Sequence, residues 1–294
     1  MRSRCSRKTA RLIIARNIGF CFGVRRAIDA AQNVLKDGKT VYSLGSIIHN
    51  PQAVKRLSEK GLKTVRDIGR LKNATLLIAS HGAEPGIIKK AEKKRLKIIN
   101  ATCPRVITSQ RLARSLDAKG SQLVIVGDKR HPEVRSLKGV SGNAVVIENS
   151  LDASRFDAGG KNIGVVVQST QSKANFFSVL SELVKKDFGK IEILNTLCRD
   201  TLKRQEEAGR LAGRCGLMIV VGGKESANTK RLFEICKKIS DTYHIETGRE
   251  LKKSWFKGVK KIGLVSGTST PDWVINEAAD RVNELIKDSS LKKR

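Results

Sequence analysis

The chain has 294 residues, of which 39% are hydrophobic, 29% are charged and 25 are glycines, a composition typical of a globular protein of one or two domains. Its 58 Lys and Arg against 28 Asp and Glu give a formal net charge of +30, which indicates a polyanionic partner such as nucleic acid, an anionic membrane or a phosphorylated substrate. The longest apolar runs, at 123–126 and 217–221, are far shorter than the roughly 20 residues that cross a bilayer, so a membrane-spanning helix is excluded.

The basic residues are spread along the whole chain rather than gathered in one block. Residues 1–16 hold six basic and no acidic residues and are predicted to be a basic tail that leads into the first strand. In stretches such as 87–97, a solvated helix face is the simpler interpretation. The six cysteines form no CxxC pair, and no hydrophobic signal core precedes the first strand, so a cytoplasmic location is expected.

Three segments repeat one pattern of a short strand, an asparagine, a cysteine and an amphipathic helix. They are residues 11–35, 95–116 and 190–212. The cysteine follows the asparagine by four residues in the first segment and by three in the others, in the pairs Asn17–Cys21, Asn100–Cys103 and Asn195–Cys198. Each cysteine is therefore predicted at the exit of a strand and the start of a helix.

A second offset supports the repeat, because the residue 28 positions after each cysteine again lies between a predicted strand and a predicted helix. These residues are His49, His131 and Ser226. A third strand, loop and helix closes each repeat, at 76–94, 164–180 and 263–282. The sequence thus predicts nine such units in three groups, with parallel sheets and right-handed crossovers.

We expect an α/β fold of three pseudo-threefold-related subdomains, each with a small parallel sheet. The predicted boundaries are 17–102, 103–197 and 198–285, with a basic C-terminal tail at 286–294. Ligands of such sheets collect beyond the carboxyl ends of the strands. If the three repeats share one axis, the three cysteines and the nine loops converge on a central site.

Three converging thiolates suit two metal species. One is zinc completed by a histidine, and the other is a 4Fe–4S cluster with one iron left without a protein ligand. The large separations between Cys21, Cys103 and Cys198 favour the cluster, since structural zinc ligands are usually paired a few residues apart. Cys5, Cys215 and Cys236 have no repeat position and are predicted to be packing residues.

Polar side chains in the same loops predict an anion pocket. His49, His81 and His131 lie in these loops, whereas His244 has no repeat equivalent. Hydroxyl and amide groups join them near helix N-termini, which favour phosphate oxygens. Among the carboxylates, Glu133 is predicted to be a proton carrier, while Asp272 is predicted to begin a helix.

Nine motifs in order make the chain resemble the 4-hydroxy-3-methylbut-2-enyl diphosphate reductase family, also called IspH or LytB. They span about residues 12–284 and read GFCFGVRRAI, IIHNPQAV, ASHGAEP, NATCPRV, RHPEVRS, QSTQSKAN, NTLCRDTLKRQ, GGKESANTKRL and SGTSTPD. The resemblance implies a trefoil of three subdomains around one 4Fe–4S cluster held by Cys21, Cys103 and Cys198. It implies that Glu133 delivers protons and that the substrate is bound by His49, His81, His131, Ser169, Ser226, Ala227, Asn228 and Ser269.

The implied reaction is the two-electron, two-proton loss of water from the allylic diphosphate, giving isopentenyl and dimethylallyl diphosphates in the methylerythritol phosphate route. Ferredoxin or flavodoxin is the implied electron donor. Departures from the family pattern are Ser169 in place of Thr, Ala227 in place of Ser, Phe22 after the first cysteine, and Arg199 with Asp200 after the third.

Two other functions stay open at this point. A basic nucleic-acid-binding α/β protein with structural cysteines would explain the charge, although no RRM, KH or zinc-finger pattern is present. A zinc hydrolase would explain the cysteines and histidines, although no HExxH pair occurs. In the reductase interpretation, the charge of +30 would attract an acidic electron carrier.

Overall fold

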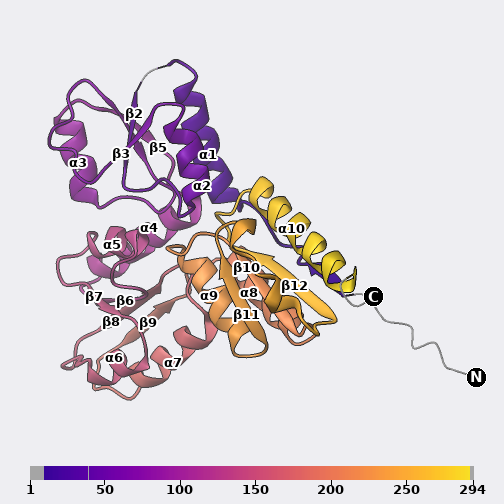
Figure 1. The fold of residues 1–294 in the computed structure, drawn as a ribbon. Helices are drawn as coiled ribbons and strands as arrows, with labels where there is room; N and C mark the ends of the chain where they lie inside the picture. The colour runs from indigo at the N-terminus through magenta and orange to yellow at the C-terminus, as the bar shows by residue number, and fades with distance from the viewer. Residues whose placement is uncertain (1–9, 39, 292–294) are drawn as a thin grey trace, which may run out of the picture. The chain divides into compact units, whose positions relative to one another are not determined.

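Residues 10–38 and 40–291 are described by a computed structural model (Figure 1). They form twelve β-strands in three four-stranded parallel sheets, together with the surrounding helices. The first nine residues of the predicted basic tail, with Cys5, lie outside the described residues. By its internal contacts the chain divides into two compact units, Cys21–Leu202 and the two chain ends, Met1–Phe20 with Lys203–Arg294.

The first sheet, in the unit Cys21–Leu202, has the strand order β3-β2-β4-β5. Its strands are β2 (Val41–Leu44), β3 (Leu62–Val65), β4 (Thr75–Ile78) and β5 (Lys97–Asn100). Figure 1 shows α3 (Pro85–Lys93) on one side of this sheet and α1 (Phe22–Leu35) with α2 (Pro51–Ser58) on the other. The central strand β4 therefore buries residues on both faces, as its run of Leu76, Leu77 and Ile78 requires.

The second sheet, in the same unit, has the order β7-β6-β8-β9. Its strands are β6 (Gln122–Val126), β7 (Val145–Ile147), β8 (Ile163–Val167) and β9 (Ile191–Leu194). Alternate residues of β6 and β8 point to opposite faces, which creates two apolar layers. One layer joins α6 (Ser150–Arg155) and α7 (Lys173–Leu183), and the other joins α4 (Pro104–Ala118) and α5 (Pro132–Lys138).

The third sheet, in the unit formed by the chain ends, has the order β1-β12-β10-β11. Its strands are β1 (Arg11–Ile14), β10 (Leu217–Val221), β11 (Asp241–Ile245) and β12 (Lys261–Ser266). Helix α10 (Asp272–Leu291) packs on one face, while α8 (Arg199–Ala212) and α9 (Ala227–Lys237) pack on the other. Two short 3₁₀ helices, Gly248–Glu250 and Lys253–Phe256, connect β11 with β12.

The strand that precedes each predicted site cysteine lies at an edge of a sheet built by the repeat before it. β5, before Cys103, pairs with β4, and β9, before Cys198, pairs with β8. β1, before Cys21, pairs with β12 from the far end of the chain. The three repeats are thus linked by exchanged edge strands, and the first is linked to the last.

The structure confirms the predicted fold class but corrects the number of strands. We expected nine strands, and the part of the chain that the structure describes contains twelve. The three unpredicted strands, β3, β7 and β11, are short edge strands with one neighbour each and carry no fully buried run. Among the described helices, none is long and apolar enough to cross a membrane.

Candidate functional site

Each of the three repeat cysteines lies at the start of a helix. Cys21 and Cys103 are the N-cap residues of α1 and α4, and Cys198 directly precedes α8. All three are partly exposed, free thiols. The asparagine of the repeat shapes two of these loops, because the side chains of Asn100 and Asn195 accept hydrogen bonds from backbone N–H groups two residues ahead, at 3.0 and 3.1 Å.

Gly23 allows the start of α1 to lie against the second cysteine. A Cβ atom at this position would lie 2.5 Å from Cys103 Sγ, so any larger residue would push the thiol away. The guanidinium of Arg26, one turn further along α1, donates to the backbone carbonyl of Thr102 at 2.9 Å. The starts of α1 and α4 are therefore held side by side, which the spacing of the cysteines could not reveal.

The electrostatics of Cys103 connect it to the other groups predicted for the site. Burial raises the pKa of this thiol, and N–H groups of Arg105 and Val106 in the first turn of α4 act in the opposite direction. The nearby charges of Cys198 and Glu133 also raise the pKa of Cys103. Cys103, Cys198 and Glu133 thus lie within electrostatic range of one another.

The three loop histidines form one cluster in the unit Cys21–Leu202. The ring centroids of His49 and His81 are 5.3 Å apart and stacked, and those of His49 and His131 are 5.4 Å apart. His49 precedes Asn50, which caps α2 by accepting from Ala53 N at 2.9 Å. His131 caps α5, where its Nδ1 accepts from Glu133 N at 3.2 Å. Helix capping therefore fixes two of the three loops that hold the cluster.

His81 is the most enclosed member of this cluster. Burial lowers its pKa well below the usual value, with smaller contributions from His49 and His131, so it is neutral at physiological pH. Among the described residues, no group hydrogen-bonds to its Nδ1. A cavity of about 300 Å³ that is also lined by Arg66 and Arg135 opens beside it. A buried ring nitrogen without a partner fits a ligand atom that is not part of the chain.

Glu133 is a buried carboxylate, 2% exposed, held from both oxygens by one residue. The backbone N–H of Ser169 donates to Oε1 and its hydroxyl donates to Oε2, each at 2.7 Å. Burial raises the pKa of Glu133, while the two hydrogen bonds from Ser169 lower it in part. The net shift is upward, which makes this group a better proton donor near neutral pH than an exposed glutamate.

Ser169 also connects Glu133 to the third cysteine. Its carbonyl oxygen accepts from Cys198 N at 2.9 Å and from the hydroxyl of Thr201 at 3.2 Å. A matching bond joins Cys103 N to the carbonyl of Ser80 at 2.9 Å, next to His81. Thr201 is a residue that the sequence did not single out, and its position one turn into α8 is the only sequence signal for it.

The remaining predicted binding residues lie in the unit formed by the chain ends. Ser226 caps α9 by accepting from Thr229 N at 3.3 Å, and Ala227 begins this helix. Asn228 is 2% exposed, and neither atom of its side-chain amide has a hydrogen-bond partner within the described part of the chain. Ser269 is also buried, in the loop between β12 and α10. An enclosed amide without partners costs about 1–3 kcal/mol unless a ligand or water satisfies it.

Residues predicted to be structural occupy structural positions. His244 lies within β11 and bonds the carbonyl of Gly222 at 2.9 Å. Cys215 and Cys236 are buried in the apolar layer under α8 and α9, where burial raises the pKa of Cys236 to about 12. Asp272 begins α10 as expected.

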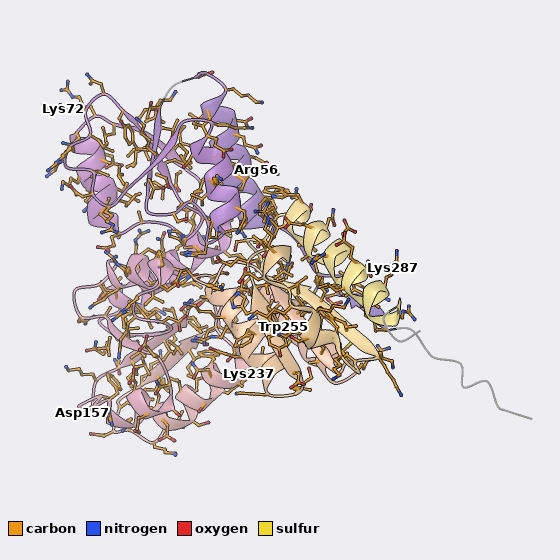
Figure 2. All side chains as sticks on the ribbon, viewed as in Figure 1. Arg56, Lys72, Asp157, Lys237, Trp255 and Lys287 are labelled. Atoms are coloured by element: carbon orange, nitrogen blue, oxygen red, sulfur yellow. The ribbon has the colours of Figure 1, made fainter. Side chains whose placement is uncertain are left out.

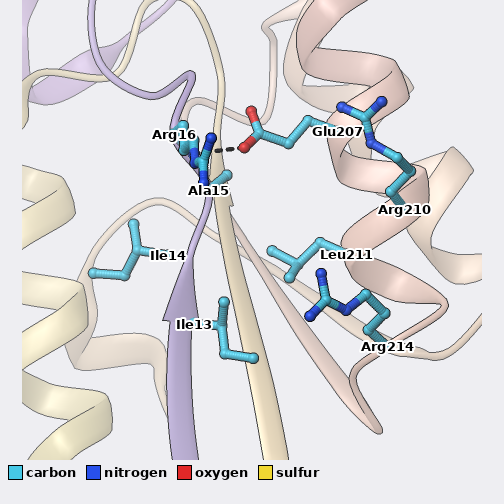
Figure 3. A pocket seen from close by; sticks show the side chains of 8 residues that line it. All are labelled: Ile13, Ile14, Ala15, Arg16, Glu207, Arg210, Leu211 and Arg214. Atoms are coloured by element: carbon cyan, nitrogen blue, oxygen red, sulfur yellow. Dashed lines mark hydrogen bonds between the residues drawn. The ribbon is translucent and has the colours of Figure 1, made fainter.

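A cavity of about 480 Å³ in the same unit contains none of the predicted site residues. Figure 3 shows Glu207 above its apolar floor, with the carboxylate bonded to Arg16 N at 2.7 Å. Glu207 also accepts from the backbone and side chain of Asn17, at 3.0 and 2.6 Å. This carboxylate fixes the asparagine of the first repeat, and the N–H two residues ahead, at Gly19, donates to Ser266 Oγ at 3.0 Å rather than to the asparagine side chain.

The donor chemistry at the three cysteines fits an iron–sulfur cluster. Within residues 10–38 and 40–291, no three His, Cys, Asp or Glu side chains lie close enough together to ligate one metal ion. An iron–sulfur cluster takes cysteine thiolates on separate irons. The three cysteines at three helix starts supply ligands of the type and number that a cluster with one open iron needs.

Comparison with known proteins identifies the family. A family model described as LytB protein matches residues 12–283. A 4-hydroxy-3-methylbut-2-enyl diphosphate reductase of Geotalea uraniireducens is 42% identical over 282 residues, which cover 95% of this chain and 99% of the relative. The chain belongs to the LytB family. The LytB relative of the same name from Pelobacter propionicus is also 42% identical, over 94% of this chain and 99% of its own.

Solved structures agree with the LytB assignment. A structure described as (E)-4-hydroxy-3-methyl-but-2-enyl diphosphate reductase, the terminal enzyme of the non-mevalonate pathway, has a TM-score of 0.66 and 40% identity, over 93% of this chain and 99% of that one. A reductase from Plasmodium falciparum has a TM-score of 0.88 and 28% identity, over 94% of this chain and 88% of that one. The resemblance drawn from nine motifs is thus confirmed.

Proposed function

We propose that this chain removes the hydroxyl group of 4-hydroxy-3-methylbut-2-enyl diphosphate reductively and releases isopentenyl and dimethylallyl diphosphates. The observation that carries the proposal is the 42% identity to a reductase of this name over 95% of the chain. Three cysteines at helix starts, one of them within electrostatic range of the buried Glu133, support it against a nucleic-acid-binding or zinc-hydrolase function. The overall change balances as R–OH + 2e⁻ + 2H⁺ → R–H + H₂O.

Cys21, Cys103 and Cys198 would hold one 4Fe–4S cluster per chain. When bound, such a cluster supplies electrons one at a time and a Lewis-acidic iron without a protein ligand. The lack of a side chain at Gly23 lets Cys103 Sγ lie against the start of α1, since a Cβ would lie 2.5 Å from the sulfur. Thiols kept free of disulfides fit the reducing cytoplasm, which is the compartment that we propose.

The chain's own polar groups would bind the diphosphate. His49, His81 and His131 present a cluster of imidazoles, and Asn228 offers an amide whose two polar atoms have no partner in the described residues. Each of these groups offers donors for phosphate oxygens, of which a group with two or three negative charges requires several, and the family pattern implies that Ser226 and Ser269 act on the same diphosphate. Ala227 provides no side-chain donor where the family pattern has Ser.

Glu133 would hold the proton that converts the departing hydroxide into water. Its raised pKa increases the protonated fraction, and the two bonds from Ser169 fix the direction in which the carboxyl points. Ferredoxin or flavodoxin is the proposed source of the two electrons. Proton and electron delivery would then come from separate components, one inside the chain and one outside it.

The test is anaerobic purification followed by a turnover assay. Brown protein with about four iron and four sulfide per chain is expected, and reduced methyl viologen should drive formation of both diphosphate products from the substrate. Colourless protein that does not convert the substrate after cluster reconstitution would overturn the proposal. Salt-dependent binding of RNA by such a colourless protein would favour the nucleic-acid-binding alternative.

A further inference from the structure

The residue after each predicted cluster cysteine is exposed. These residues are Phe22, Pro104 and Arg199. Phe22 is the most unusual of the three, because 73% of this large apolar side chain is exposed. A single exposed apolar side chain is common on protein surfaces, so Phe22 indicates a partner only through its place beside Cys21 and the charges near it. The three cysteine residues are themselves partly exposed.

The exposed side chains that follow Phe22 in the first turn of α1, and those at the starts of α4 and α8, include several arginines. Arg25 and Arg26 on α1 and Arg105 on α4 are exposed, and neither helix has an acidic residue in its first turn. Arg199 adds a positive charge at α8, where the acidic Asp200 is half-buried. The positive ends of the helix dipoles act in the same direction. Because a Cβ on Gly23 would lie 2.5 Å from Cys103 Sγ, the starts of α1 and α4 form one continuous surface.

We propose that Phe22, Arg25, Pro104, Arg105 and Arg199, here called the cysteine-side surface, form the docking site for an acidic one-electron carrier protein, with Phe22 as its apolar anchor. This inference rests on the proposed function, which requires such a carrier. An aromatic centre with an arginine rim is typical of protein interfaces. Electron-transfer complexes are small and transient, so one anchor and a few charges suffice.

The surface also explains how electrons would reach the cysteines. Each reduced carrier gives up one electron and leaves oxidised, so two encounters supply the two electrons that one substrate molecule consumes. Phe22 directly follows Cys21, so a carrier bound to Phe22 would lie one residue away from a proposed cluster ligand. Other basic side chains, such as Lys72, Lys237 and Lys287 in Figure 2, lie outside α1, α4 and α8, and their charge attracts the same partner over longer distances.

The experiment compares two reductants with one set of variants. Phe22→Ser should raise the KM for a reduced acidic 2Fe–2S ferredoxin about tenfold, while turnover with reduced methyl viologen stays within about twofold because this small reductant needs no docking surface. Phe22→Leu, which keeps an apolar side chain, should give a KM for ferredoxin between those of the wild type and Phe22→Ser. The matched control is Phe177→Ser, which removes a phenylalanine that is 53% exposed on α7 and should change neither value.

Charge reversal tests the arginines of the cysteine-side surface. The double variant Arg25→Glu and Arg105→Glu should weaken ferredoxin binding about tenfold at low ionic strength, and the difference should shrink with added salt. Isothermal titration of the cluster-loaded protein with oxidised ferredoxin measures the dissociation constant of the complex without any turnover. Lys60→Glu with Lys89→Glu, at two exposed lysines of the first subdomain, is the control for net charge.

Each result has one meaning. No substrate conversion by the wild type with either reductant would overturn the proposed function itself. Normal conversion with methyl viologen but unchanged ferredoxin KM and binding in the Phe22 and arginine variants would overturn the docking site alone. An equal loss with both reductants would also overturn it, because Phe22 would then act within the site. Loss of a wild-type dimer in Phe22→Ser, with ferredoxin binding intact, would assign the surface to self-association instead.

Discussion

Ser169 donates two hydrogen bonds to Glu133, from its backbone N–H and from its hydroxyl, each over 2.7 Å. Both carboxylate oxygens are therefore fixed by a single residue whose carbonyl in turn accepts from Cys198 N. Burial and these donors act on the pKa of Glu133 in opposite directions, and burial is the stronger influence. The balance between them can be changed by single substitutions.

Replacing Glu133 with Gln should remove the proton donor but keep a side chain of almost the same size and shape. We expect kcat to fall at least about 100-fold, while iron content and substrate affinity remain near those of the wild type. Single-turnover kinetics together with iron analysis measure both quantities. Near-normal turnover would remove Glu133 from the mechanism.

Ser169→Ala should shift the pH profile rather than abolish activity. The hydroxyl of Ser169 stabilises the charged carboxylate, so its removal raises the pKa of Glu133 further and the protonated acid persists to higher pH. The alkaline limb of the kcat profile should therefore move to higher pH, with kcat lower by about tenfold because the carboxyl is held less firmly. Ser169→Thr, which keeps the hydroxyl, should retain the wild-type profile. An identical profile in the alanine variant would contradict this role.

The two classes of cysteine should respond differently to substitution by Ser. Changes at Cys21, Cys103 or Cys198 should each lower bound iron strongly, since each removes one proposed thiolate ligand. Cys215→Ser and Cys236→Ser should keep the iron but destabilise the apolar layer in which both lie. Iron analysis and thermal denaturation distinguish the classes, and iron loss from the Cys236 variant would mean that the ligands are assigned wrongly.

Asn228→Leu should separate stability from binding. The amide has no partner among the described residues and is almost fully buried, so an apolar side chain of similar size should leave the free energy of unfolding unchanged or raise it by about 1 kcal/mol. Substrate KM should rise at least about tenfold. The control Ser226→Ala removes the N-cap of α9 and should lower the free energy of unfolding by about 1 kcal/mol. Marked destabilisation by leucine would show that Asn228 is structural.

His81 predicts a pH dependence of stability. Its pKa in the folded chain lies well below 6.5, so the unfolded chain binds a proton that the folded chain excludes. The free energy of unfolding should consequently be unaffected by this group above the ordinary histidine pKa and fall by up to about 1.4 kcal/mol per pH unit below it. Chemical denaturation of wild type and His81→Gln between pH 5 and 8 measures how the free energy of unfolding of each protein changes with pH. The wild type should show the steeper fall at low pH, and the two slopes should be equal near pH 8. An equal slope in both proteins at low pH would contradict the prediction.

Much of the fold and the positions of the site loops follow from the repeat in the sequence. An apolar strand, an asparagine and a cysteine before an amphipathic helix are local features, and so is the 28-residue offset that leads to His49 and His131. The structure brings these two rings to 5.4 Å. Local patterns place each of these loops at the carboxyl edge of its own parallel sheet. Because β2 and β6 belong to different sheets, the meeting of the two rings also depends on packing between the sheets.

Other features depend on contacts that no local pattern records. β3 and β7 are short edge strands whose pairing needs the rest of their sheets. The importance of Gly23 follows only from its distance to Cys103, 80 residues away, and Thr201 matters through a carbonyl on another loop. The unusual exposure of Phe22 likewise appears only after α1 has been packed.

The pairing of β1 with β12 has a consequence for biosynthesis. Residues 11–14 are translated long before the strand that they pair with, residues 261–264. The first two sheets can form while synthesis continues, but the third must wait for β12. The strand that precedes Cys21 is therefore paired only after β12 has been made, so iron delivery by cellular assembly factors would follow the translation of β12.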